Sequence, residues 1–132
     1  MNTRSYNIRR ARKIAKLAYA WCETNFGHPL KTVSSQFKVS DDRRVSNLMG
    51  HYLDRDIVIY VRNCTSYADV IRTVIHEYTH YLQMPKMTDN SKYYRMDKIY
   101  GYDNNPFEVE AVENEKKYYK VSKNYIYSRL KK

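Results

Sequence analysis

Two histidines stand four residues apart at His76 and His80, and Glu77 directly follows the first of them. On a helix, residues four apart project from the same face, so both imidazoles can reach one metal ion. A carboxylate one position further round can instead reach a water held by the metal, where a general base is needed. The chain contains only 4 histidines, so this spacing is rarely a coincidence. The pattern predicts a zinc site with Glu77 as general base.

The surrounding stretch VIRTVIHEYTHYLQ (70–83) predicts an amphipathic helix. Its apolar side holds Val70, Ile71, Val74, Ile75, Tyr78 and Leu82, and its polar side holds Thr73, His76, Glu77, His80 and Gln83. Because the histidines lie off the apolar side, the competing interpretation is a plain polar face exposed to solvent. Ser66 as a cap predicts a start near Tyr67, and Pro85 ends the helix.

A catalytic zinc ion needs a third protein ligand and an open position for water. The other histidines, His28 and His51, precede the motif, so the downstream candidates are acidic. They are Glu108, Glu110, Glu113 and Glu115 in the stretch NNPFEVEAVENE (104–115), with Asp89, Asp97 and Asp103 in the segment before it. Glu108 and Glu110 point about 200° apart around a helix, so only one of them can serve. Glu108 has a competing role, because it stands three residues after Asn105, where it could cap the helix.

The stretches HEYTHYLQ and NPFEVEA together resemble the gluzincin branch of zinc metallopeptidases, in which a glutamate from a later helix completes an HExxH motif. The likeness covers residues 56–115, less than half of the chain. It implies the zinc ligands His76, His80 and Glu108 and the general base Glu77. Glu108 is preferred to Glu110 because Ala111, three residues on, supplies the small side chain expected there.

One position departs from that family. Val112 stands where the family often has Asp or Asn to orient a ligand histidine, so the orienting residue must come from elsewhere. The resemblance implies hydrolysis of a peptide or protein substrate, with zinc polarising the carbonyl and Glu77 moving the proton. For some small gluzincins it suggests a DNA-bound regulator as the target. The candidate donors to the oxyanion are Tyr93, Tyr94, Tyr100 and Tyr102.

The order of the helices and strands expected from the sequence predicts a single zincin-like α+β domain over residues 1–132. It comprises a helix over about 5–26, strands over 30–39, 48–53 and 57–61, the motif helix, and a glutamate-bearing helix from Pro106 to the C-terminus. The sheet is expected to be mainly antiparallel, because the connections are too short to hold crossover helices. Strand 57–61 is either a core strand or an edge strand that pairs with substrate. The polar segment 84–105 is either partly ordered or a lid-like active-site loop.

Composition limits the remaining possibilities. No apolar run is long enough to cross a membrane and no export signal is evident, so a cytoplasmic protein is expected, with Cys22 and Cys64 as reduced thiols. The net charge is +10, but the basic residues are spread along the sequence, which is typical of a solubility feature. Direct nucleic-acid binding is therefore not the favoured interpretation. The alternative function is a non-catalytic zincin-like module whose basic surface binds nucleic acid or an acidic protein.

Overall fold

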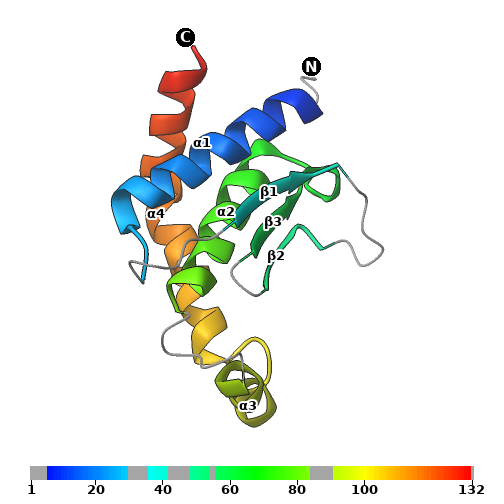
Figure 1. The fold of residues 1–132 in the computed structure, drawn as a ribbon, viewed down its shortest axis with the longest axis vertical. Helices are drawn as coiled ribbons and strands as arrows, with labels where there is room; N and C mark the ends of the chain where they lie inside the picture. The colour runs from blue at the N-terminus through cyan, green and yellow to red at the C-terminus, as the bar shows by residue number, and fades with distance from the viewer. Residues whose placement is uncertain (1–5, 30–35, 42–47, 54–55, 84–90, 132) are drawn as a thin grey trace.

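A computed structural model describes residues 6–29, 36–41, 48–53, 56–83 and 91–131. In chain order the elements are α1 (Ile8–Phe26), β1 (Gln36–Ser40), β2 (Gly50–Leu53), β3 (Asp56–Tyr60), the 3-10 turn η1 (Val61–Asn63), α2 (Tyr67–Leu82), α3 (Ser91–Tyr100) and α4 (Pro106–Leu130). Helix α2 lies at the centre, between the sheet on one side and α1 and α4 on the other (Figure 1). The predicted α+β class is confirmed.

The first helix begins slightly later than predicted, because Asn7 caps it. The Asn7 side chain accepts a hydrogen bond from the Arg10 backbone N–H at 2.9 Å. The buried stripe consists of Ala11, Ile14, Ala15, Ala18, Trp21 and Cys22. Gly27, with φ of 69°, ends the helix, and its N–H donates to the Glu23 carbonyl. The small alanines let α1 pack closely on α2.

The sheet has the order β1-β3-β2, with β1 parallel and β2 antiparallel to β3. The prediction of a mainly antiparallel sheet is therefore wrong for the β1–β3 pair. No crossover helix is needed, because β2 itself returns the chain and β3 then inserts between β1 and β2. The interpretation of strand 57–61 as an edge strand is also wrong, since β3 is central and β2 lies at an edge. Residues 30–35 of the predicted first strand lie outside the described residues.

Helix α2 is buried on its polar side as well as its apolar side. Its apolar core residues are fully buried: Val70, Ile71, Val74, Ile75, Tyr78 and Tyr81. On the other side, Glu77 is 9% exposed and His80 is 7% exposed. The interpretation of a solvent-exposed polar face is wrong, because α4 and β2 cover it. Strand β2 can lie this close to α2 only because residue 50 is glycine: a Cβ there would lie 2.7 Å from the Thr73 Cγ2.

Helix α3 lies within the segment 84–105, so the described part of this segment contains a helix, and no residue of α3 is fully buried. Residues 84–90 lie outside the described part of the chain. Gly101, with φ of 81°, follows α3. The Asn105 side chain then accepts a hydrogen bond from the Phe107 N–H at 3.0 Å, and Pro106 opens α4, as the sequence predicts.

Both cysteines, Cys22 and Cys64, are buried free thiols. Across the ranges described above, no helix combines the length and the apolar character needed to span a membrane.

Candidate metal centre

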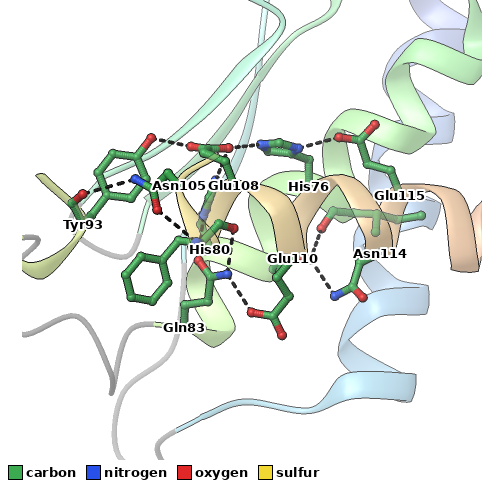
Figure 2. A network of polar contacts seen from close by, with 12 residues as sticks. His76, His80, Gln83, Tyr93, Asn105, Glu108, Glu110, Asn114 and Glu115 are labelled. Carbon is green, nitrogen blue, oxygen red and sulfur yellow. Dashed lines mark hydrogen bonds and ion pairs between the residues drawn. The ribbon is translucent and has the colours of Figure 1, made fainter. Parts of the chain in front are cut away.

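Two histidines and one glutamate meet between α2 and the first turn of α4. The Glu108 Oε1 atom lies 2.9 Å from His76 Nε2 and 3.2 Å from His80 Nε2 (Figure 2). The three potential ligand atoms all lie within 4.8 Å of one another. Two imidazole nitrogens and a carboxylate oxygen are ligands that one transition-metal ion can accept together. The group could therefore hold a metal ion.

The second nitrogen of each imidazole is held by a separate partner. His76 Nδ1 lies 2.5 Å from Glu115 Oε2, and His80 Nδ1 lies 2.8 Å from Gln83 Oε1. Both partners are oxygen acceptors, so each Nδ1 carries a proton and donates. Without a metal ion, each Nε2 also donates to the ionised Glu108, because the pKa values of both histidines are raised and the charged form prevails. The ring orientation is the one that a metal-ligating histidine needs, and loss of the Nε2 proton would expose a lone pair to the ion.

Gln83 is itself fixed in the orientation that this contact requires. Its Nε2 donates to the Phe107 carbonyl at 3.0 Å and to Glu110 Oε1 at 2.8 Å. The amide nitrogen therefore faces α4, and Oε1 is left to accept from His80. Glu110 is exposed and contributes to the site only through Gln83. The structure brings Glu108 to the histidines and leaves Glu110 outside the ligand group.

The residues that orient the histidines were not identified from the sequence. Val112, at the position expected to orient a histidine, is 39% exposed, and its apolar side chain has no hydrogen-bond acceptor to offer. Glu115 lies seven residues after Glu108, or two helical turns, which places both on one face of α4. Gln83 stands three residues after His80 in the same way. The helical spacing of Glu115 from Glu108 and of Gln83 from His80 is therefore the sequence signal that points to these two residues.

The Glu108 carboxylate belongs to the site rather than to a helix cap. Tyr93 of α3 donates a hydrogen bond from its hydroxyl to Glu108 Oε2. The Glu108 backbone N–H bonds to the Asn105 carbonyl, as an ordinary first-turn contact does. Burial opposes ionisation of Glu108, but the hydrogen bonds to His76 and His80 outweigh it and hold the pKa of this carboxyl well below its usual range. The glutamate is therefore ionised in the site.

Of the four candidate tyrosines, Tyr93, Tyr94 and Tyr102 line the cleft beside the histidines, and Tyr100 does not. The Tyr93 hydroxyl is engaged with Glu108. The Tyr102 side chain is 59% exposed, but partial burial of its hydroxyl, the charge of Glu108 and a hydrogen bond to the same carboxylate raise its pKa to about 12. The Tyr102 phenol therefore keeps its proton across the neutral range and can donate a hydrogen bond.

The charges around the histidines favour a cation at the centre. Burial lowers the pKa of His76, but the hydrogen bonds to Glu108 and Glu115 raise it more, to about 10. The pKa of His80 is also raised: burial again opposes the charged form, but the contacts with Glu108 prevail. Burial raises the pKa of Glu77, although the two histidines partly oppose this. The negative potential of three carboxylates thus draws positive charge to this point.

Two cavities open beside the ligand group, and each is about 230 Å³ in volume. Both are lined by Leu48, Gly50, His76 and Glu77. The first extends along β2 toward Tyr93 and Tyr102, and the second extends toward Arg72 and Glu115. A chain lying along β2 would therefore pass beside Glu77 with space on either side of it.

Comparison with known protein families, with curated proteins and with solved structures finds no match.

Proposed function

We propose that this protein is a zinc-dependent peptidase of gluzincin type, with His76, His80 and Glu108 as ligands and Glu77 as general base. The observation that carries the proposal is the convergence of two imidazole Nε2 atoms on one carboxylate oxygen, with each opposite nitrogen anchored. In the metal-free protein the raised pKa values of His76 and His80 keep both imidazoles charged beside Glu108, and a metal ion would take the place of the two Nε2 protons between the same atoms.

Zinc suits this donor set better than the other common metal ions. Calcium and magnesium prefer oxygen ligands, whereas imidazole suits zinc and its neighbours. Two histidines and one glutamate leave a tetrahedral ion one open position, as catalytic zinc sites do. The cavity beside His76 and Glu77 gives that position access to a substrate.

When bound, zinc would supply a Lewis acid that lowers the pKa of a water molecule and polarises a carbonyl group. Glu77 is buried beside the ligands and its pKa is raised, so its carboxylate is a stronger base than an exposed glutamate. It would take the proton from the attacking water and pass it to the leaving amine. The Tyr102 hydroxyl, which retains its proton, would donate a hydrogen bond to the developing oxyanion.

The edge strand β2 would position the substrate. It pairs with β3 on one side and lines the cleft beside the ligands. An extended peptide can add to a sheet edge through main-chain hydrogen bonds, which orient it independently of its side chains. The alternative, a non-catalytic module, has less support, because burial of the Glu77 carboxylate opposes folding and a binding module would gain nothing from it.

The proposal is tested by incubating the zinc-loaded protein with an unfolded protein such as casein and identifying fragments by mass spectrometry. Cleavage is expected with zinc and is expected to stop when a chelator removes it. Restoring zinc should restore cleavage. If zinc binds at one equivalent and casein and a diverse peptide mixture both remain intact, the peptidase proposal is wrong.

Replacing Glu115 with alanine is expected to weaken zinc binding by roughly 10- to 100-fold, because the side chain that orients His76 would be absent. Competition with a chromophoric chelator measures this affinity. The matched control is Glu113→Ala, which removes the same side chain and charge from an exposed position on the same helix. Equal affinities in the two variants would show that Glu115 does not orient the ligand.

A further inference from the structure

Much of the positive charge of the described residues lies on two helices, α1 and the second part of α4. In α4, residues 106–115 carry glutamates and no basic residue, whereas residues 116–131 carry Lys116, Lys117, Lys120, Lys123, Arg129 and Lys131 and no acidic residue. In α1, residues 8–22 carry five basic residues and no acidic one: Arg9, Arg10, Arg12, Lys13 and Lys16. The start of α1 and the end of α4 both lie at the end of the molecule opposite α3 (Figure 1).

The dipole of α4 does not account for this distribution. Basic residues near a helix C-terminus stabilise the helix, but the effect is confined to about the last turn. Only Arg129 and Lys131 lie there. Lys116, Lys120 and Lys123 lie further back, where their mutual repulsion has no such compensation. A partner with negative charge would compensate it.

Cations lie near tyrosine rings where α1, α2 and α4 pack together. The Arg72 guanidinium lies 4.4 Å from the centre of the Tyr119 ring, and Lys123 Nζ lies 5.9 Å from the same ring. The Arg10 guanidinium lies 5.9 Å from the centre of the Tyr67 ring. These pairs come from three different helices, so they form a surface rather than a stripe along one helix.

Tyr127 joins the two groups of residues. Burial, followed by Tyr119, raises the pKa of its phenol and Arg10 lowers it, so this hydroxyl lies within electrostatic range of both groups. We call the resulting surface the basic face; it comprises Arg10, Tyr67, Arg72, Tyr119, Lys123 and Tyr127, with the exposed Lys116 and Lys120 beside them. The nearby acidic residue on α2, Asp69, accepts hydrogen bonds from the Thr65 N–H and hydroxyl, both at 3.0 Å.

We propose that the basic face binds the phosphate backbone of double-stranded DNA, independently of base sequence. Arginine and lysine side chains on a surface supply the phosphate contacts that dominate this kind of binding. Proteins that bind single strands instead offer open aromatic rings on which bases stack. Here cations lie over the rings of Tyr67 and Tyr119, so these rings are not open platforms for bases. The arrangement favours a duplex, whose bases remain paired and whose phosphates face outward.

The test is the fluorescence anisotropy of a short labelled duplex, titrated with the full-length protein between ~50 and ~200 mM salt. We expect binding at the lower salt and a steep fall in affinity as salt rises. The variant Arg10→Gln/Lys120→Gln/Lys123→Gln should weaken binding and reduce the slope of log K against log salt by about three, roughly one for each phosphate that the variant no longer neutralises. Circular dichroism checks that the variant folds.

The matched control is Lys92→Gln/Arg95→Gln/Lys98→Gln, which removes the same charge from α3 at the opposite end. It should leave the slope and the affinity for duplex near those of the parent. Several results would overturn the proposal: no binding at ~50 mM salt, equal weakening by both triple variants, tighter binding of a single strand of the same length, or binding of anionic vesicles without binding of duplex. The assay needs no zinc, so a lack of DNA binding would not count against the peptidase proposal. A lack of peptide cleavage would likewise not count against DNA binding.

Discussion

Replacing Glu77 with glutamine is expected to reduce peptide hydrolysis by about 10²- to 10⁴-fold, the usual contribution of a general base, while zinc remains bound. Glutamine has nearly the same shape but cannot accept the proton from the attacking water. The ligands His76, His80 and Glu108 are untouched, so metal content should not change. The measurement is kcat/KM on a peptide substrate together with zinc per chain by elemental analysis.

Stability gives a second readout for Glu77→Gln. Because burial raises the pKa of Glu77 in the folded protein, its charged form opposes folding at pH values above the ordinary pKa of a glutamate. A neutral glutamine removes that cost, so the metal-free variant should unfold at no lower temperature than the parent at pH 7. The control is Glu113→Gln at an exposed position. Hydrolysis at the parent rate in Glu77→Gln would exclude Glu77 as the base.

Replacing Glu108 with alanine is expected to reduce zinc from about one equivalent to nearly none, and His80→Ala should do the same, because two ligands hold zinc far less tightly than three. The matched control is Glu110→Ala, two residues away on the same helix. Glu110 lies outside the ligand group, and Gln83 keeps its second anchor at the Phe107 carbonyl. This variant should therefore retain most of its zinc.

Removing the metal should also show which variants depend on it for stability. A ligand present at 100 times its dissociation constant stabilises the folded state by about 2.7 kcal/mol. For a domain of this size, that corresponds to roughly 10 °C in Tm. A chelator should lower the Tm of the parent and of Glu110→Ala, and leave that of Glu108→Ala unchanged. Zinc retained in Glu108→Ala but absent from Glu110→Ala would reverse the assignment of the third ligand.

The parts of the fold that follow local rules could be predicted from the sequence. Ser66 and Asn105 cap α2 and α4 because their side-chain oxygens satisfy free backbone N–H groups near them in sequence. The spacing of His76 and His80 places them on one side of α2 for the same local reason. Such signals depend on a few neighbouring residues and need no knowledge of the tertiary structure.

The parts that depend on contacts distant in sequence could not be predicted in this way. The parallel pairing of β1 with β3 depends on where β3 inserts, which alternation of apolar residues does not specify. The burial of Glu77 depends on packing by α4 and β2. The role of Glu115 is an intermediate case. Its spacing from Glu108 is visible in the sequence, but its contact with His76 depends on the packing of α4 on α2.

The ligand group joins α2 to α4, because His76 and Glu108 lie 32 residues apart in the sequence. A metal ion held there acts as a cross-link, closing a loop that contains the whole of α3. In a chain-entropy estimate, a permanent bond closing a loop of this length restricts the unfolded chain by roughly 3–4 kcal/mol. Zinc would thus act like a reversible disulfide in a chain whose two thiols, Cys22 and Cys64, are unpaired. If the backbone were cleaved within α3, a bound metal ion would still hold the two fragments together through ligands from both.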